Sequence, residues 1–122
     1  MDDRKRIEAY LSLVKKALST GGLLIFANRE KNLAFIKRHG LTIAEIRECI
    51  LCLSLSNYCN GPLYDNSGDN RHDVWIFGTK LGDVEVYIKL SFGNSINTII
   101  CISFHEAERV MLYPFGGEHE NN

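Results

Sequence analysis

Three side chains suited to acid–base chemistry on a phosphate occur in two apolar segments in the second half of the chain. Tyr87 and Lys89 lie two residues apart in VYIKL, and His105 ends the segment ICISFH. An imidazole exchanges a proton near neutral pH, an ammonium is a point cation, and a phenol can donate a hydrogen bond. Metal-independent RNA cleavage needs such a set: a base for the 2′-OH, a cation for the phosphorane and an acid for the 5′-oxygen.

Each of these residues has a simpler explanation when it is taken alone. A tyrosine in a strand most often packs, and a lone lysine most often keeps a surface soluble. A histidine at a strand end most often marks the point where the strand meets water. Without a shared surface, the set indicates only a sheet with ligand-like side chains.

Alternation of apolar and polar residues predicts which side chains share a face of the sheet. The residues expected in the core are Val74, Ile76, Val84, Val86, Ile88, Leu90, Phe92, Ile100, Ile102 and Phe104. The opposite, uncovered face is then expected to carry Trp75, Tyr87, Lys89, Ser103 and His105, with Glu85 nearby. On that face the Trp75 ring would be a platform on which an unpaired base stacks.

Hydrophobic spacing predicts helices first and strands afterwards. The expected helices are 3–19, 28–39 and 42–53, and the expected strands are 23–26, 73–78, 83–92 and 97–105, with a short edge segment at 112–115. Asn28 is a predicted N-cap, Gly40 a predicted helix stop, and Thr42 with Glu45 a predicted capping box. We therefore expect an α+β fold with helices on one face of an antiparallel sheet, built from a three-strand meander plus short edge strands.

The segment 57–72 is rich in Asn, Asp and Gly, and it contains the pair Gly61-Pro62. We expect a long loop here, since apolar periodicity is almost absent. A loop of this length inside a compact domain is more often functional or mobile than idle, and its polar side chains include Asn60, Arg71 and His72.

Composition sets the class of protein. The chain has 122 residues, 45% of them hydrophobic and 24% charged, which is typical of one globular domain. No apolar run approaches the roughly 20 residues of a membrane-spanning helix, and the start of the chain lacks a signal-like apolar run, so we expect a cytoplasmic protein. Nine Lys/Arg face four Asp/Glu in residues 1–40, against five and eleven in the rest. A basic N-terminal third is compatible with phosphate binding and equally with a solvated helix face.

Cys49 and Cys52 form a CxxC within the apolar helical pattern ECILCLSL. Such a pair can bind zinc or carry redox chemistry, but there is no second CxxC or glycine nearby. We favour core thiols over a metal site.

The order and spacing of several segments resemble the MqsR-family toxins of bacterial type II toxin–antitoxin modules. These segments are LSLVKKAL, LTIAEIRECILCLSLSNY, VYIKL and CISFH, together with YCNGPLYD, DVWIFG, SFHEAE and YPF, over roughly residues 10–115. The resemblance implies one RelE-like domain over 1–122, with a polar, flexible tail from about 116. It also implies an endoribonuclease that cuts mRNA without a metal, cofactor or ribosome, and an antitoxin encoded by an adjacent gene.

Some residues match the family's functional positions and others depart from them. Tyr87 and Lys89 fall on the tyrosine and lysine of the family's strand, where the tyrosine is catalytic. His105 stands where better-known members have a catalytic lysine, and Asn60 stands close to another lysine of theirs. Arg71 or His72 corresponds loosely to a family glutamine.

We expect a shifted division of labour at these positions. His105 is expected to be the general acid or base, and Tyr87 to assist proton transfer or to stack. Lys89, with Arg109, would stabilise phosphate charge, and Trp75 would stack a base.

Two other classes of function remain open on the sequence. One is a catalytically silent RNA- or protein-binding module that kept the fold and lost the acid–base set. The other is a different small hydrolase or nucleotidyl enzyme on the same face, against which the absence of a phosphate-binding glycine loop or metal triad counts.

Overall fold

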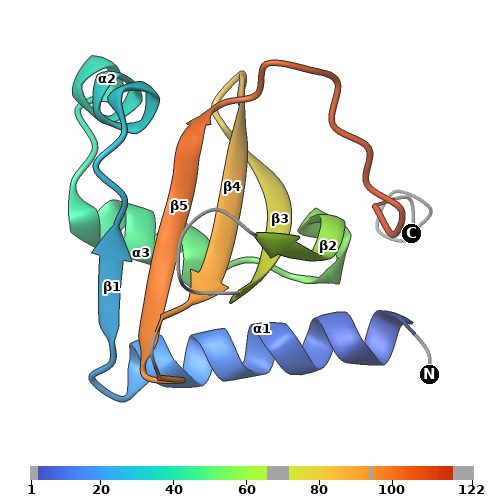
Figure 1. The fold of residues 1–122 in the computed structure, drawn as a ribbon. Coiled ribbons are helices and arrows are strands. Elements are labelled where there is room, and N and C mark those ends of the chain that lie inside the picture. The colour runs from blue at the N-terminus through green and yellow to red at the C-terminus, as the bar shows by residue number, and fades with distance from the viewer. Residues whose placement is uncertain (1–2, 66–71, 94, 117–122) are drawn as a thin grey trace.

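A computed structural model describes residues 3–65, 72–93 and 95–116. Its elements are α1 (Asp3–Ser19), β1 (Leu23–Phe26), α2 (Glu30–His39), α3 (Ile43–Leu51), the 3-10 turn η1 (Leu55–Asn57), β2 (Tyr58–Asp65), β3 (His72–Leu81), β4 (Val84–Phe92) and β5 (Thr98–Glu106). The five strands form one sheet in the order β1-β5-β4-β3-β2 (Figure 1). The α+β class and the central meander are therefore confirmed.

The sheet is mixed, whereas the sequence led us to expect an antiparallel one. β1 pairs with β5 in parallel, from Leu23 opposite Thr98 to Phe26 opposite Cys101. The pairs β2–β3, β3–β4 and β4–β5 are antiparallel. Periodicity located the strand 23–26 correctly, but it carries no information about the direction of the neighbour, which lies more than 70 residues away.

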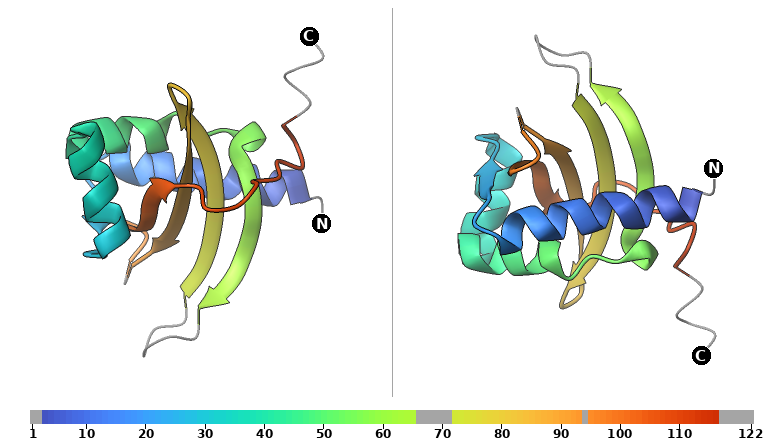
Figure 2. Two further views of the ribbon diagram at one scale, coloured as in Figure 1. Left: turned by 90° about the horizontal axis from the view of Figure 1, so that it is seen from above. Right: turned by 90° about the horizontal axis from the view of Figure 1, so that it is seen from below.

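Helices α1 and α3 cover the same face of the sheet (Figure 2). The stripe expected on α1 is buried, and it packs with Ile46 and Ile50 of α3 against the apolar side of β4. The other face of β4 and β5 is left for polar residues. No helix in the described part of the chain is long and apolar enough to cross a membrane.

The predicted helix ends are mostly confirmed. Thr42 and Glu45 form the capping box, with Glu45 N–H donating to Thr42 Oγ1 over 3.1 Å and Thr42 N–H to Glu45 Oε1 over 2.8 Å. Gly40 ends α2 in the left-handed conformation, at φ 61°. The N-cap prediction for Asn28 is wrong, because α2 begins at Glu30 and the extended Arg29 precedes it without a side-chain cap.

The face predicted for β3 is inverted. Trp75 pairs with Leu90 and Phe77 with Ile88, so both rings lie in the core. The Trp75 ring stacks on Tyr10 of α1 at 4.3 Å between centroids. Every residue from Val74 to Phe77 is apolar, so alternation alone could not choose a face, and the larger aromatic pair takes the buried side.

A bulge in β5 corrects part of the core prediction. Ser103 pairs with Lys89 but Cys101 pairs with Leu90, so Ile102 is an extra residue in β5. Ile99 and Cys101 are thereby turned into the core in place of the expected Ile100 and Ile102. Phe104 keeps its predicted buried side, and Ser103 and His105 keep theirs on the opposite face.

Two segments differ in secondary structure from the prediction. The first half of the expected loop 57–72 is strand β2, which pairs with β3 through two register shifts around Asn60 and Leu63. Residues 112–115 form no strand. They belong to an extended segment, residues 107–116, that follows β5 and leads toward the β2 side of the sheet (Figure 1). We call this segment the C-terminal strap.

The cysteines are not all core thiols. Cys101 is buried, Cys49 is half-buried and Cys52 is exposed. Among the described residues, no group of three or more His, Cys, Asp or Glu is arranged to hold a metal ion. The tail 117–122 lies outside the described residues.

Candidate functional site

The structure brings Tyr87, Lys89 and His105 to one surface. Tyr87 pairs directly with His105 across β4 and β5, and Lys89 pairs with Ser103. The Tyr87 and His105 rings stack with centroids 5.4 Å apart and planes 22° from parallel. The bulge begins one pair further along the ladder, so it leaves these neighbours in place.

This surface is the floor of a cleft of about 600 Å³. Its lining comes from α2's N-terminal side, from the four strands β2 to β5 and from the strap: Arg29, Cys59, Asn60, Ile76, Tyr87, Lys89, Ser103, His105, Glu108, Arg109, Val110, Met111 and Leu112. The elements therefore gather a histidine, a phenol and several cations around one hollow.

The other predicted site residues divide into three groups. Asn60, which the family resemblance indicated, and Arg109, expected to act with Lys89, both line the cleft. Trp75 lies under α1 and is 6% exposed, so its prediction as a stacking platform is wrong. His72 begins β3, and Arg71 lies outside the described residues.

Two parts of the cleft were missed by the sequence reasoning. Arg29 enters from the residue before α2, and only the packing of α2 against β5 brings it near. The strap supplies Met111 and its neighbours, which the sequence placed near an edge strand. Nothing in the local sequence marks the strap, because its place is set by a contact between Gly78 and Tyr113, which are 35 residues apart.

Gly78 allows the strap to lie on the sheet. It pairs with Tyr87, and a Cβ at this position would collide with the Tyr113 hydroxyl and approach Met111 Cε within 2.9 Å. The Tyr113 hydroxyl donates to Glu85 Oε2 over 2.7 Å, which ties the strap to β4. The cleft therefore has a fixed wall on this side.

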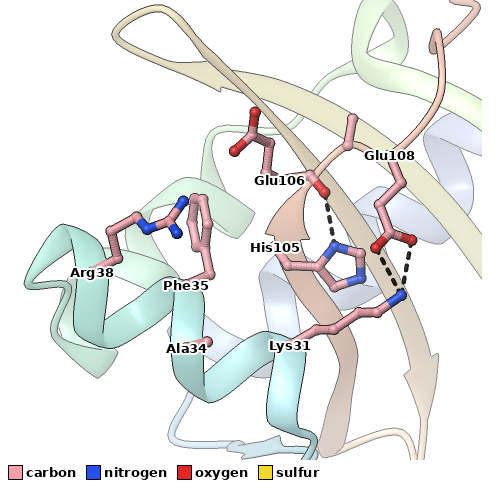
Figure 3. Close-up of a pocket in the computed structure, with 8 residues that line it drawn as sticks. Lys31, Ala34, Phe35, Arg38, His105, Glu106 and Glu108 are labelled. Atoms are coloured by element: carbon pink, nitrogen blue, oxygen red, sulfur yellow. Dashed lines mark hydrogen bonds and ion pairs between the residues drawn. The ribbon is translucent and has the colours of Figure 1, made fainter.

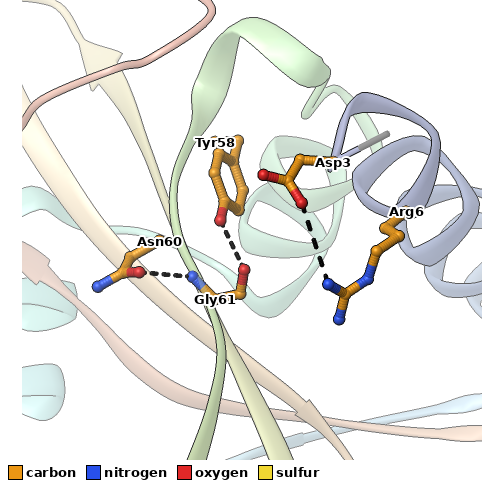
Figure 4. Close-up of polar contacts among 5 residues, drawn as sticks. All are labelled: Asp3, Arg6, Tyr58, Asn60 and Gly61. Atoms are coloured by element: carbon orange, nitrogen blue, oxygen red, sulfur yellow. Dashed lines mark hydrogen bonds and ion pairs between the residues drawn. The ribbon is translucent and has the colours of Figure 1, made fainter. Parts of the chain in front are cut away.

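Asn60, in β2, lies in the wall of the cleft formed by that strand. Its Oδ1 accepts a hydrogen bond of 2.8 Å from Gly61 N–H, and the Tyr58 hydroxyl donates to the Gly61 carbonyl (Figure 4). The Asn60 amide nitrogen points away from Gly61, with no hydrogen-bond partner among the described residues. This nitrogen can donate to an acceptor bound in the cleft.

The tautomer of His105 follows from one hydrogen bond. His105 Nδ1 lies 2.9 Å from the Glu106 carbonyl oxygen (Figure 3). A carbonyl only accepts, so in the neutral ring Nδ1 carries the proton and Nε2 holds the free lone pair. Nε2 is therefore the nitrogen that can take up a proton.

Burial keeps the phenols and the thiol of the site protonated at neutral pH. It raises the pKa of Tyr87, with the Cys59 thiol adding to the shift and Arg29 opposing it. Burial also raises the pKa of Cys59 to about 12, with Glu85 adding to it. The pKa of Tyr113 is raised by burial and by its hydrogen bond to Glu85. Tyr87 is thus a proton donor rather than a base near pH 7.

The charge around the cleft favours an anion. Arg29, Lys89 and Arg109 line it with Glu108 as the single carboxylate of its lining. The Glu108 carboxyl has a pKa lowered by a hydrogen bond from Lys31, with smaller effects of His105 and Arg109. A carboxylate therefore sits among the same cations that would attract a phosphate.

Comparison of the chain with protein-family models, curated proteins and solved structures gave no match. Any proposal about function therefore rests on the residues of the cleft alone.

Proposed function

We propose that this protein is a metal-independent endoribonuclease that cuts mRNA, and that it is the toxin of a type II toxin–antitoxin module with a RelE-like fold. The observation that carries the proposal is the stacked pair Tyr87 and His105 beside Lys89, on the floor of a cleft lined by cations. The α+β architecture, with helices on one face and this surface on the other, is compatible with that fold.

The proposed reaction uses the protonation states described above. His105 Nε2 removes the proton of the ribose 2′-OH, and the 2′-oxygen forms a bond to phosphorus. The bond to the 5′-oxygen breaks, and that oxygen takes the Tyr87 proton. The products are a 2′,3′-cyclic phosphate and a 5′-hydroxyl, and proton transfer from His105 to the tyrosinate restores both groups.

The cations stabilise the charge of the transition state. Lys89 lies on the floor beside Ser103, while Arg29 and Arg109 line the cleft from the α2 and strap sides. Fixed cations in a partly desolvated cleft stabilise a phosphorane more than water does. The Asn60 amide nitrogen is available for a phosphate or base oxygen.

His105→Ala tests the proposal in purified protein with chelator present. We expect it to lower the RNA cleavage rate by about a hundredfold or more, the usual effect of losing a positioned acid or base. His39→Ala is the matched control, since His39 lies on α2 and lines neither wall of the cleft. Cleavage by His105→Ala at the wild-type rate, or no cleavage by the wild-type protein, would overturn the proposal.

The toxin assignment has its own test in cells. Induced expression should arrest growth, and co-expression of the neighbouring small gene should relieve the arrest. RNA recovered from arrested cells should carry 5′-hydroxyl ends. An unaffected culture containing folded protein would favour a silent binding module instead.

A further inference from the structure

A second hollow of about 370 Å³ lies on the other side of His105 (Figure 3). It is formed by α2, the end of β5 and the start of the strap, and its lining is Lys31, Ala34, Phe35, Arg38, His105, Glu106, Ala107 and Glu108. His105 and Glu108 also line the cleft. The two hollows therefore lie next to each other, with His105 and Glu108 between them.

The hollow has a rigid wall. Lys31, Ala34, Phe35 and Arg38 follow the i, i+3, i+4, i+7 spacing, so they form one stripe of α2. Ala34 leaves room between the two cationic side chains, and Phe35 is buried beneath them. The buried Asn32 binds α2 to β5 through two hydrogen bonds, with Ile102 and Phe104, and a third goes to the Ala27 carbonyl. The helix that carries the cations is consequently held beside the end of β5.

An ion pair stands at the junction of the two hollows. Lys31 Nζ contacts Glu108 Oε2 at 2.7 Å and Oε1 at 2.9 Å. Their side chains are 63% and 58% exposed, so water screens the pair and it contributes little to stability. Because the pair is exposed and weak, a phosphodiester of RNA that binds Lys31 and Arg38 together can displace the Glu108 carboxylate from Lys31 at little cost.

Arg38 is available for an anion. It makes no hydrogen bond or ion pair within the described segments 3–65, 72–93 and 95–116. Its guanidinium suits a phosphate because the planar fork can donate two parallel hydrogen bonds. Glu106 also lines the hollow, but its carboxylate points away from Lys31 in Figure 3.

We propose that this hollow is a second RNA subsite, in which Lys31 and Arg38 bind the phosphate that flanks the one cut at His105. The Glu108 carboxylate stays paired with Lys31 until RNA displaces it, so Glu108 competes with the substrate for Lys31. The inference rests on the proposed ribonuclease function and adds a direction to it: RNA passes from the cleft, across the imidazole, to α2.

Binding of uncleavable RNA tests the subsite directly. The probes are labelled 2′-O-methyl oligonucleotides of random sequence, a trinucleotide and a decanucleotide, which lack the attacking hydroxyl. Arg38→Gln should weaken decanucleotide binding about tenfold and lower its salt slope by about 0.7. It should leave trinucleotide binding nearly unchanged, since a short probe can stay in the cleft.

Glu108→Gln should act in the opposite direction. With Lys31 released, decanucleotide binding should tighten about two- to fivefold, as expected when a weak, exposed ion pair no longer competes with RNA. Lys37→Gln is the matched control for Arg38→Gln, and Glu30→Gln is the matched control for Glu108→Gln. Each control removes one charge of the same sign from a residue of α2 that lines neither hollow. Opposite signs in the two variants distinguish a subsite from a loss of structure.

The outcomes separate the two proposals. Wild-type protein that binds neither probe overturns the ribonuclease proposal and the subsite together. Wild-type binding with equal losses in Arg38→Gln and Lys37→Gln overturns the subsite alone, as does weaker binding by Glu108→Gln.

Discussion

The tyrosine of the site has one protonation state over the working pH range, and this decides its role. Burial is the largest cause of the raised pKa of Tyr87, and the nearby Arg29 only partly offsets it. The pKa of Tyr87 lies above the ordinary tyrosine value of about 10, so the phenol keeps its proton at and well above neutral pH. A protonated phenol next to a free His105 Nε2 favours tyrosine as acid and histidine as base.

Tyr87→Phe should therefore lower the rate of RNA cleavage about a hundredfold. A ribonucleoside 3′-(p-nitrophenyl) phosphate needs no acid, because its leaving group departs as the anion. On that substrate Tyr87→Phe should be nearly as fast as the wild type, while His105→Ala stays slow. Equal losses for Tyr87→Phe on both substrates would contradict its role as the acid.

Residue positions could be predicted where alternation was unambiguous. β4 alternates apolar with polar residues, so Tyr87 and Lys89 were placed on the correct face. β3 offers apolar residues on both faces, and nothing local told Trp75 from Ile76. Only the ring of Tyr10, brought by α1 to 4.3 Å from the indole, settles that Trp75 is in the core.

At the scale of elements, one buried amide joins α2 to the sheet. Asn32 Nδ2 donates to the Ile102 carbonyl over 2.9 Å and to the Ala27 carbonyl over 3.2 Å, and its Oδ1 accepts from Phe104 N–H over 2.9 Å. β1 ends its pairing at Cys101, so the side chain satisfies the edge of β5 where β1 stops. His105 follows directly after this anchor.

Asn32→Ala should lower the free energy of unfolding by about 2–4 kcal/mol, since the buried Phe104 N–H and the Ile102 carbonyl lose the side chain that bonds them, while the Ala27 carbonyl keeps its bond from Arg29 N–H. The rate of RNA cleavage should fall as well, because α2 and the end of β5, which carries His105, lose their fixed position relative to each other. Urea denaturation measures the first effect. Asn28→Ala is the control, and as an exposed residue it should stay within about 0.5 kcal/mol of the wild type.

The position of the strap on the sheet depends on Gly78. Gly78→Ala should push Tyr113 and Met111 from the sheet and weaken RNA binding, because the strap forms one wall of the cleft. The double variant Gly78→Ala with Tyr113→Phe removes the oxygen in closest conflict, and it should recover part of the binding. A double variant no better than Gly78→Ala alone would show that the strap is not the element displaced.

Elements with local signals could be predicted, and those made by pairing could not. The capping box at Thr42 and the end of α2 at Gly40 each depend on a few adjacent residues, so the local sequence predicts them. β2 has turn-forming residues at Asn60 and Gly61, and it is a strand only because β3 pairs with it across two register shifts. The β5 bulge likewise has no sequence signal in ICISFH.

At the scale of the whole molecule, the sheet has one face covered by helices and one face that carries the cleft, and contacts of the strap connect the two. α1 and α3 cover the packed face, and the strap closes one side of the other. The strap's Phe115 contacts Tyr58 at 6.1 Å between centroids and the Arg4 guanidinium at 5.7 Å. Phe115 therefore joins the end of the strap to both α1 and β2.

Burial of many phenols and thiols makes the whole fold sensitive to alkali. The groups with raised pKa are Tyr10, Cys49, Tyr58, Cys59, Tyr87, Cys101 and Tyr113, and burial is the largest cause in each. In the unfolded chain, thiols ionise from about pH 8.5 and phenols from about pH 10. Their folded pKa values are higher, so above these pH values the unfolded state binds fewer protons than the folded state.

Stability should therefore be full below about pH 8 and should fall as the pH rises, by up to about 1.4 kcal/mol per pH unit for each of the deeply buried groups Tyr10 and Cys101, and by less for the partly exposed ones. Urea denaturation under reducing conditions, from pH 7 to about pH 10.5, measures the fall. Tyr10→Phe is the sharpest variant, because the buried Tyr10 hydroxyl has no hydrogen-bond partner among the described residues. It keeps the ring stack on Trp75, so its stability at pH 7 should equal or exceed that of the wild type, and its decline above pH 10 should be shallower. A wild-type protein equally stable across this range would show that these groups are open to solvent.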